Sequence, residues 1–198
     1  MTQYVARADS NVTVYAIAKI FQEYIVDANG ITSEYSYKAA SSMLEGLDFV
    51  LDDVSIFAGM ISRKHFSDEA NYWTAGLFVS AAINKVIKKD ETVTLDFASL
   101  GCPADCIGYK FKQGKISLQG DAGDYLGENM SGGSIVIHGN AGFYVGFHMS
   151  DGDITIHGNT GDQVGTYMSG GVIRIEGQVG SMPESCRGKI YHRETLLR

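Results

Sequence analysis

A 19-residue repeat in the second half of the chain restricts the possible folds more than any other feature of the sequence. Three successive segments align without gaps, namely KISLQGDAGDYLGENMSGG (115–133), SIVIHGNAGFYVGFHMSDG (134–152) and DITIHGNTGDQVGTYMSGG (153–171). A fourth segment (172–190) keeps the first half of the pattern, and an earlier one (96–114) keeps three of its glycines. A unit this short cannot bury a core alone, so neighbouring repeats must stack.

Apolar residues occur at fixed positions of the repeat. Near the start of each repeat, two apolar positions are separated by one outward position, which is typical of a short β-strand with one buried face. These columns are Ile116/Ile135/Ile154/Ile173 and Leu118/Ile137/Ile156/Ile175, and further inward columns are Leu126/Val145/Val164 and Met130/Met149/Met168. The pattern predicts a single-chain β-solenoid from about Phe97 to Ile190, with no helix inside any coil.

Glycines also recur in columns, and they account for most of the 24 glycines of the chain. The repeat glycines include Gly120, Gly139, Gly158, Gly123, Gly142, Gly161, Gly127, Gly146 and Gly165. Because glycine adopts a positive φ without steric cost, we expect these columns to form the turns of each coil. A phosphate-binding loop is a poor alternative, since such a loop requires a helix directly after the glycines.

The first ninety residues predict helices instead. Apolar residues at helical spacing favour a helix from Asn11 to about Gly30, a second from Ser33 to about Leu51, and a third from Asp68 to Lys89. The stretch 54–61 fits either a strand or a helix. We therefore expect an α+β protein with a small helical domain (residues 1–90) that covers the first coil, a β-helix (91–190) and a C-terminal tail (191–198). Pro183 and Glu184, which break the repeat, are expected to end the stack.

The charge balance and the N-terminus limit the possible partners and location. With 16 Lys and Arg against 23 Asp and Glu, the net charge is −7, whereas nucleic-acid binding requires a basic surplus. The first twenty residues lack the apolar core of a signal peptide, and no apolar run is long enough to span a bilayer. Three cysteines form no disulfide framework. We expect a cytoplasmic protein that binds neither nucleic acid nor membrane.

The repeat resembles the GXGXG-type β-helix shared by the C-terminal domain of the glutamate synthase large subunit and by the β-helical subunit of formylmethanofuran dehydrogenase. The segments that carry the resemblance are GDAG (120–123), GNAG (139–142) and GNTG (158–161), together with MSGG (130–133), MSDG (149–152) and MSGG (168–171). The resemblance covers roughly residues 91–190, about half of the chain. It implies that the single-stranded β-helix is right-handed.

In both families the β-helix supplies none of the catalytic chemistry. In glutamate synthase it resembles a spacer between the amidotransferase and synthase domains, and in the dehydrogenase it resembles a scaffold beside the metal-bearing subunits. The resemblance therefore implies no catalytic residues and no cofactor in this chain. It implies other protein subunits of an oxidoreductase complex as partners.

Two groups of side chains could nevertheless carry chemistry. His138 and His157 occupy one outward column between Gln119 and Glu176, where stacked imidazoles could bind a metal or could simply form a side-chain ladder, which we favour. Cys102 and Cys106, in the segment GCPADC, could form a metal or redox pair, or could fill turn positions. Cys186, about four coils away, lies too far from them to share one site.

Two further columns leave alternatives open. Asp121, Asn140 and Asn159 fit a ladder of hydrogen-bonding side chains, with weak cation binding as the alternative. The tyrosines Tyr125 and Tyr144, near Phe143, either present an aromatic strip to a partner or lie under the N-terminal domain.

Three functional hypotheses follow from these observations. The leading hypothesis is a non-catalytic scaffold subunit of an oxidoreductase complex. The second is an enzyme or metal-binding protein that uses His138 and His157, or Cys102 and Cys106, on a small substrate. The third is a structural protein that self-associates through the sides of its solenoid.

Overall fold

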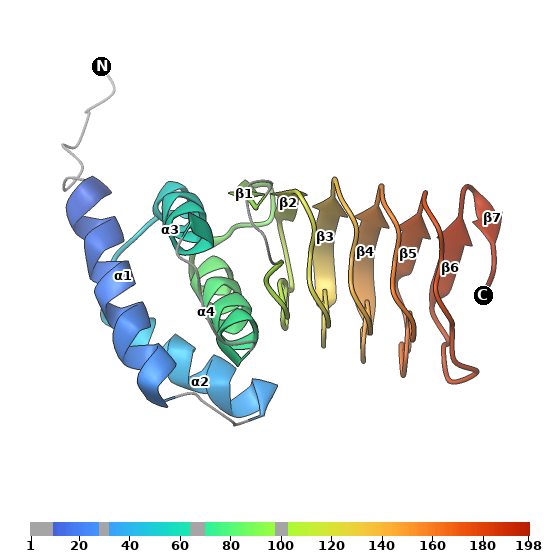
Figure 1. Cartoon of the computed structure of the whole chain (residues 1–198), viewed down its shortest axis with the longest axis horizontal. Coiled ribbons are helices and arrows are strands. Elements are labelled where there is room, and N and C mark those ends of the chain that lie inside the picture. The colour runs from blue at the N-terminus through green and yellow to red at the C-terminus, as the bar shows by residue number, and fades with distance from the viewer. Residues whose placement is uncertain (1–9, 28–31, 64–69, 98–102) are drawn as a thin grey trace, which may run out of the picture.

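A helical domain lies at one end of the molecule, and a stack of β-coils extends away from it (Figure 1). The computed structural model describes residues 10–27, 32–63, 70–97 and 103–198. Its helices are α1 (Ser10–Asp27), α2 (Ser33–Leu44), α3 (Leu51–Arg63) and α4 (Ala70–Val86). Its strands are β1 (Thr92–Asp96), β2 (Lys115–Gln119), β3 (Ser131–Ile137), β4 (Asp151–Ile156), β5 (Val172–Ile175), β6 (Lys189–His192) and β7 (Thr195–Leu196). The predicted α+β fold with a β-solenoid is thus confirmed.

The seven strands form one sheet in which each strand pairs with the next strand along the chain. Lys115 of β2 pairs in parallel with Ser134 of β3, 19 residues later, and the next two steps have the same length. The first coil is longer, because Thr92 pairs with Lys115, 23 residues later. The last coil is shorter, because Val172 pairs with Lys189, 17 residues later. The 19-residue coil therefore describes the three central coils, and the coils at both ends depart from it.

The interior of the solenoid is filled by the predicted apolar columns. Their side chains are at most 1% exposed from Ile116 to Ile175, and the methionine column is equally buried. The same hydrophobic cluster continues into the helical domain through Phe21, Phe57 and Phe78. Because burying one such side chain contributes about 1.5–3 kcal/mol, each coil depends on its neighbours for stability.

The glycine columns have two structural causes, although we predicted only one. Gly127 adopts a φ of +69°, as expected for a turn, and its equivalents in the next two coils do the same. Gly139 and Gly142 do not adopt a positive φ. A Cβ on Gly139 would lie 2.5 Å from the carbonyl oxygen of Gly120 in the preceding coil. The expectation of turns is therefore wrong for Gly139 and Gly142, where glycine is required because successive backbones approach closely.

Side-chain ladders connect successive coils on the outside. Oδ1 of Asp121 accepts a hydrogen bond from the backbone amide of Asn140 at 2.7 Å, and Oδ1 of Asn140 accepts one from Asn159 at 2.9 Å. A second ladder, which sequence reasoning missed, is formed in the same way by Asp105, Asp124 and Asp162, whose Oδ1 atoms accept from the amides of Asp124, Phe143 and Ser181. These contacts favour the ladder interpretation of Asp121, Asn140 and Asn159 over a cation site.

The helices of the N-terminal half agree in part with the prediction. α1 and α4 lie within the predicted ranges 11–30 and 68–89 to within one residue, and residues 28–30 and 68–69 lie outside the described part of the chain. The segment 54–61, for which strand and helix were both possible, belongs to α3. Among the described residues, no helix combines the length and the apolar character needed to cross a bilayer.

The predicted helix from Ser33 to about Leu51 is wrong in its second half, because α2 ends at Leu44. The ammonium group of Lys85, from α4, binds the carbonyl oxygens of Glu45 at 3.0 Å and Leu47 at 2.8 Å, as well as that of Leu44. A cation at these free carbonyl groups stabilises a helix C-terminus. A new helix, α3, starts at Leu51.

The helix α4 attaches the helical domain to the first coil through three residues spaced four apart. A Cβ on Gly76 would lie 1.6 Å from the carbonyl oxygen of Asp105, so only glycine allows the helix to approach this closely. The hydroxyl of Ser80 donates to the carbonyl oxygen of Cys106 and accepts from the amide of Gly108, both at 3.0 Å. Asn84 donates to the carbonyl oxygen of Tyr109 at 2.9 Å. The helical domain therefore covers the first coil, as predicted.

The other end of the stack is closed by a short hairpin. Residues 191–198, which we expected to be a tail, contain the end of β6 and the two-residue strand β7, which pairs antiparallel with β6. The expectation that Pro183 and Glu184 end the stack is also wrong, because β6 follows them and still pairs in parallel with β5. A very short edge strand limits pairing with further strands.

Candidate functional site

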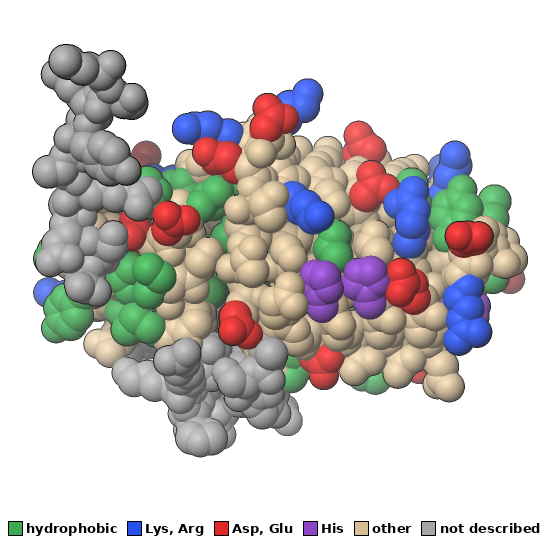
Figure 2. Space-filling model, turned by 90° about the horizontal axis from the view of Figure 1, so that it is seen from above, with side chains coloured by type: hydrophobic (Ala, Val, Ile, Leu, Met, Phe, Trp, Pro, Cys, Tyr) green, Lys and Arg blue, Asp and Glu red, His purple; other side chains and the backbone are tan. Residues whose placement is uncertain are grey.

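His138 and His157 lie side by side on the outer face of the sheet, where Figure 2 shows histidine side chains next to each other. Their ring centroids are 5.2 Å apart, with an angle of 29° between the ring planes. Nε2 of His138 lies 3.3 Å from Oγ of Ser117, and Nδ1 of His157 lies 2.9 Å from a carboxylate oxygen of Glu176. These two nitrogens are hydrogen-bonded at opposite ends of the column, so the rings form a ladder.

A metal site at this column would require several ligand atoms that converge on one point. Within the described ranges, no group of three or more His, Cys, Asp or Glu side chains is arranged to hold a metal ion. The geometry therefore favours the ladder over the metal-binding alternative for His138 and His157.

The cysteine pair can be described only at Cys106, because Cys102 lies outside the described residues. The Cys106 side chain is fully buried, and its Sγ lies 3.9 Å from a carboxylate oxygen of Glu128. Burial, and then the negative charge of Glu128, raises the pKa of the Cys106 thiol. A thiol of raised pKa is a poor nucleophile and a poor metal ligand, so Cys106 acts as a core residue.

A polar network connects α2 to the first two coils. The ammonium group of Lys110 binds the carboxylate of Glu34, which also accepts from the hydroxyl of Tyr109 at 3.0 Å. The hydrogen bonds from Lys110 and then Lys38 lower the pKa of Glu34 to about 2. Since the Glu34 side chain is 43% exposed, solvent screening leaves this pairing a small stabilising effect.

Glu128 belongs to the same junction but is buried, with 7% of its surface exposed. Its carboxylate accepts a hydrogen bond from the Ser33 hydroxyl at 3.2 Å, which ties the second coil to the start of α2. Burial raises the pKa of Glu128 to about 6. This carboxyl group therefore titrates close to neutral pH, and repeat-based reasoning did not find it because the equivalent positions hold Phe147 and Thr166.

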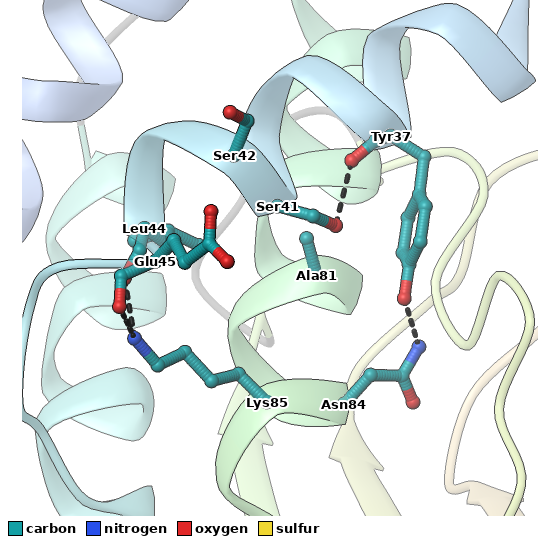
Figure 3. A pocket seen from close by; sticks show the side chains of 8 residues that line it. All are labelled: Tyr37, Ser41, Ser42, Leu44, Glu45, Ala81, Asn84 and Lys85. Carbon is teal, nitrogen blue, oxygen red and sulfur yellow. Dashed lines mark hydrogen bonds between the residues drawn. The ribbon is translucent and has the colours of Figure 1, made fainter.

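A pocket of about 370 Å³ lies between α2 and α4 (Figure 3). Asn84 donates to the hydroxyl of Tyr37 at 2.9 Å across it, and Ser41 donates to the carbonyl oxygen of Tyr37 at 2.8 Å. Lys85 points at the end of α2, whose carbonyl groups it caps. The main polar groups of the pocket are thus engaged in holding the two helices together.

A continuous row of aromatic rings runs from α4 along the side of the solenoid. We define the aromatic strip as Trp73, Tyr125, Tyr144, Phe147, His148 and Tyr167. Trp73 meets Tyr125 edge-on at 4.9 Å between centroids, and Tyr125 stacks on Tyr144 at 4.8 Å with an interplanar angle of 11°. His148 stacks on Tyr167 at 5.0 Å, and Phe147 contacts Tyr125, Tyr144 and Tyr167.

The aromatic strip answers the alternatives that the sequence left open for the tyrosines. Trp73 of the helical domain covers part of Tyr125, while Tyr167 at the other end is 57% exposed. Phe143 is 48% exposed and makes no ring contact with the strip among the described residues. The strip is therefore partly covered at one end and open along the rest, and it includes Phe147, His148 and Tyr167, which sequence reasoning missed.

The backbone beneath the strip is unusual. In the coils, two columns of residues other than glycine adopt φ values between 53° and 65°, namely Cys106/Tyr125/Tyr144/Gln163 and Lys110/Asn129/His148/Tyr167. This left-handed conformation costs bulky side chains roughly 1–2 kcal/mol each, and glycine adopts it freely. Four of the six strip residues occupy these positions, in a chain that uses glycine at other left-handed turns.

The fold and these sites define a class of protein, a β-solenoid of about five coils with a helical domain at one end and a short hairpin at the other. Comparison of the chain with protein-family models, with curated proteins and with solved structures finds no match. The function is therefore inferred from the chain's own residues and from the resemblance of its repeat.

Proposed function

We propose that this chain is a non-catalytic scaffold subunit of a cytoplasmic oxidoreductase complex, related in its β-helix to the GXGXG-repeat proteins that its repeat resembles. A right-handed course of the coils is part of this proposal, and parallel strands joined by crossover connections are right-handed in about 98% of cases. The partners would be the cofactor-bearing subunits of the complex.

One observation carries the proposal, which is that the solenoid is a packed rod with both ends closed. The interior columns are at most 1% exposed, α4 covers the first coil, and β7 closes the last. A rod of this kind leaves its sides as the surfaces available to other molecules. Such a geometry suits a spacer or support better than a protein that encloses a substrate.

The alternative is an enzyme in which the exposed pair His138 and His157 takes part in the reaction. To separate the two, the tagged chain should be purified gently from its native source with its bound subunits, and the dye-linked redox turnover of the assembly measured. The double variant His138→Ala/His157→Ala should keep turnover within about twofold of wild type, like the control Thr155→Ala on the same face. A loss of about tenfold or more, equivalent to about 1.4 kcal/mol in activation free energy, would favour the enzyme.

A further inference from the structure

We infer that the aromatic strip is an interface through which two copies of this chain associate side to side. The strip crosses three consecutive coils, since Tyr125, Tyr144 and Tyr167 belong to the segments 115–133, 134–152 and 153–171. Its rings contact one another without a break from Trp73 to Tyr167. This inference goes beyond the proposed function, which concerns other subunits.

The backbone conformation indicates that these side chains have a role outside the fold. Tyr125, Tyr144, His148 and Tyr167 have φ values of 55° to 59°, where glycine would be favoured. Ring contacts between partly exposed aromatic side chains return only about 0.5–1.5 kcal/mol per pair. Folding stability alone therefore gives little reason to keep aromatic residues here. Non-glycine residues in this conformation are concentrated at binding sites.

The charge distribution favours a second copy over a partner of opposite charge. None of the six strip side chains carries a permanent charge, whereas the chain as a whole carries a net charge of −7. A symmetric interface brings identical patches together, so an uncharged patch avoids the repulsion that acidic patches would create. The nearby carboxylates Asp124 and Asp162 each use Oδ1 to bind a backbone amide of the next coil.

The size of the strip is adequate for a dimer at the lower end of the usual range. A fully covered aromatic side chain buries about 150–250 Å², so six partly exposed rings offer on the order of 500 Å² per copy. Specific interfaces bury about 600–1,000 Å² per partner, so flanking side chains such as Phe143, itself 48% exposed, would supply the remainder.

The position of the strip also defines the symmetry of the dimer. Its central residues, Tyr144, Phe147 and His148, all lie in the coil 134–152, with ring contacts extending to the coils on both sides. A two-fold axis through this coil places the Trp73 end of one strip opposite the Tyr167 end of the other. The solenoids then lie antiparallel, with their closed ends free.

The test is the mass of the purified full-length chain in solution, measured by light scattering after size-exclusion chromatography at about 1–50 μM, a range that detects micromolar dissociation constants. We expect twice the chain mass of 21.4 kDa. The variants Tyr144→Gly and Tyr167→Gly should be monomeric and should keep the wild-type melting temperature within a few degrees, because relief of the left-handed strain offsets the lost ring contacts.

Gln163→Gly is the matched control, because Gln163 shares the column and conformation of Tyr144 but lies outside the strip. This variant should remain dimeric. If a glycine variant fails to fold, Tyr144→Asn and Tyr167→Asn replace it, since Asn tolerates the left-handed conformation. A monomeric wild type, or a dimer that survives loss of the strip rings, overturns the inference. A monomeric chain whose strip variants release other subunits would assign the strip to a different partner and also overturns it.

Discussion

At the scale of single residues, Glu128 couples the stability of the junction to pH. Burial raises its pKa from the usual value of about 4.5 to about 6, so the folded chain binds this proton more tightly than the unfolded chain. Stability from this group is complete below about pH 4.5, falls as the pH rises towards 6 and stays lowered above it. The loss amounts to at most about 2 kcal/mol.

The variant Glu128→Gln should therefore be more stable than wild type at pH 8, by about 1–2 kcal/mol, and nearly equal to it at about pH 4.5. Glutamine retains an oxygen that can accept the Ser33 hydrogen bond and does not ionise. Urea unfolding at the two pH values measures the difference.

Glu34→Gln is the control, because the lowered pKa of Glu34 gives stability that is present above about pH 4.5 and lost only as the pH falls towards 2. Its effect should be similar at about pH 8 and about pH 4.5. If Glu128→Gln shows no gain at the higher pH, ionisation of the buried carboxylate does not destabilise the junction.

Some residue-level features could be predicted from the sequence, and others could not. The inward columns followed from alternation, since polar Ser117 and Thr155 separate the buried aliphatic residues. The ladder through Asn140 followed from the recurrence of Asp and Asn in one column. The left-handed Tyr144 and Tyr167 could not be predicted, because the residue type there contradicts the backbone conformation.

At the scale of elements, the coil is the unit of the fold. Each coil contacts its neighbours through the same columns, and the stability of such an array is approximately the sum of its repeats and their interfaces. The ends differ because they serve other contacts: the first coil accommodates α4, and the last is followed by the hairpin of β6 and β7. Sequence periodicity alone therefore predicted the central coils well and the end coils poorly.

Deletion of one whole coil, residues 134–152, should give a folded protein. The deletion brings Ile116 against Ile154 and keeps every inward column in register. At about 0.05–0.15 kcal/mol per residue, the loss of one coil should lower the free energy of unfolding by roughly 1–3 kcal/mol.

Deletion of residues 134–143, which is not a whole coil, moves apolar residues out of the core and should abolish cooperative unfolding. Circular dichroism during thermal unfolding distinguishes the two deletions. Equal behaviour of both would show that the register of the columns does not stabilise the chain.

The break between α2 and α3 shows why the helical domain was harder to predict. The apolar spacing continues across Leu44 and Leu47, so the sequence favours one helix. The cap that ends α2 comes from Lys85, about forty residues away, which local patterns do not reveal. By contrast, the attachment residues Gly76, Ser80 and Asn84 recur at four-residue spacing in an apolar helix, a signal that could have been found.

At the scale of the whole molecule, the chain is a rod with closed ends and accessible sides (Figure 1). The position of the helical domain over the first coil was predictable, because an exposed end of a solenoid must be covered. Which side face binds a partner was not, because that depends on rings from three coils and α4 that meet only in the folded chain. The scaffold proposal depends on partners that bind these sides.

The measurement that tests this proposal most directly is native mass spectrometry, with metal analysis, of the chain purified gently from its native source. We predict that the chain is recovered at fixed stoichiometry with subunits that carry molybdenum, tungsten, iron–sulfur or flavin centres. Recovery of this chain alone, as the 21.4 kDa monomer or as a closed homo-oligomer, would contradict the scaffold function.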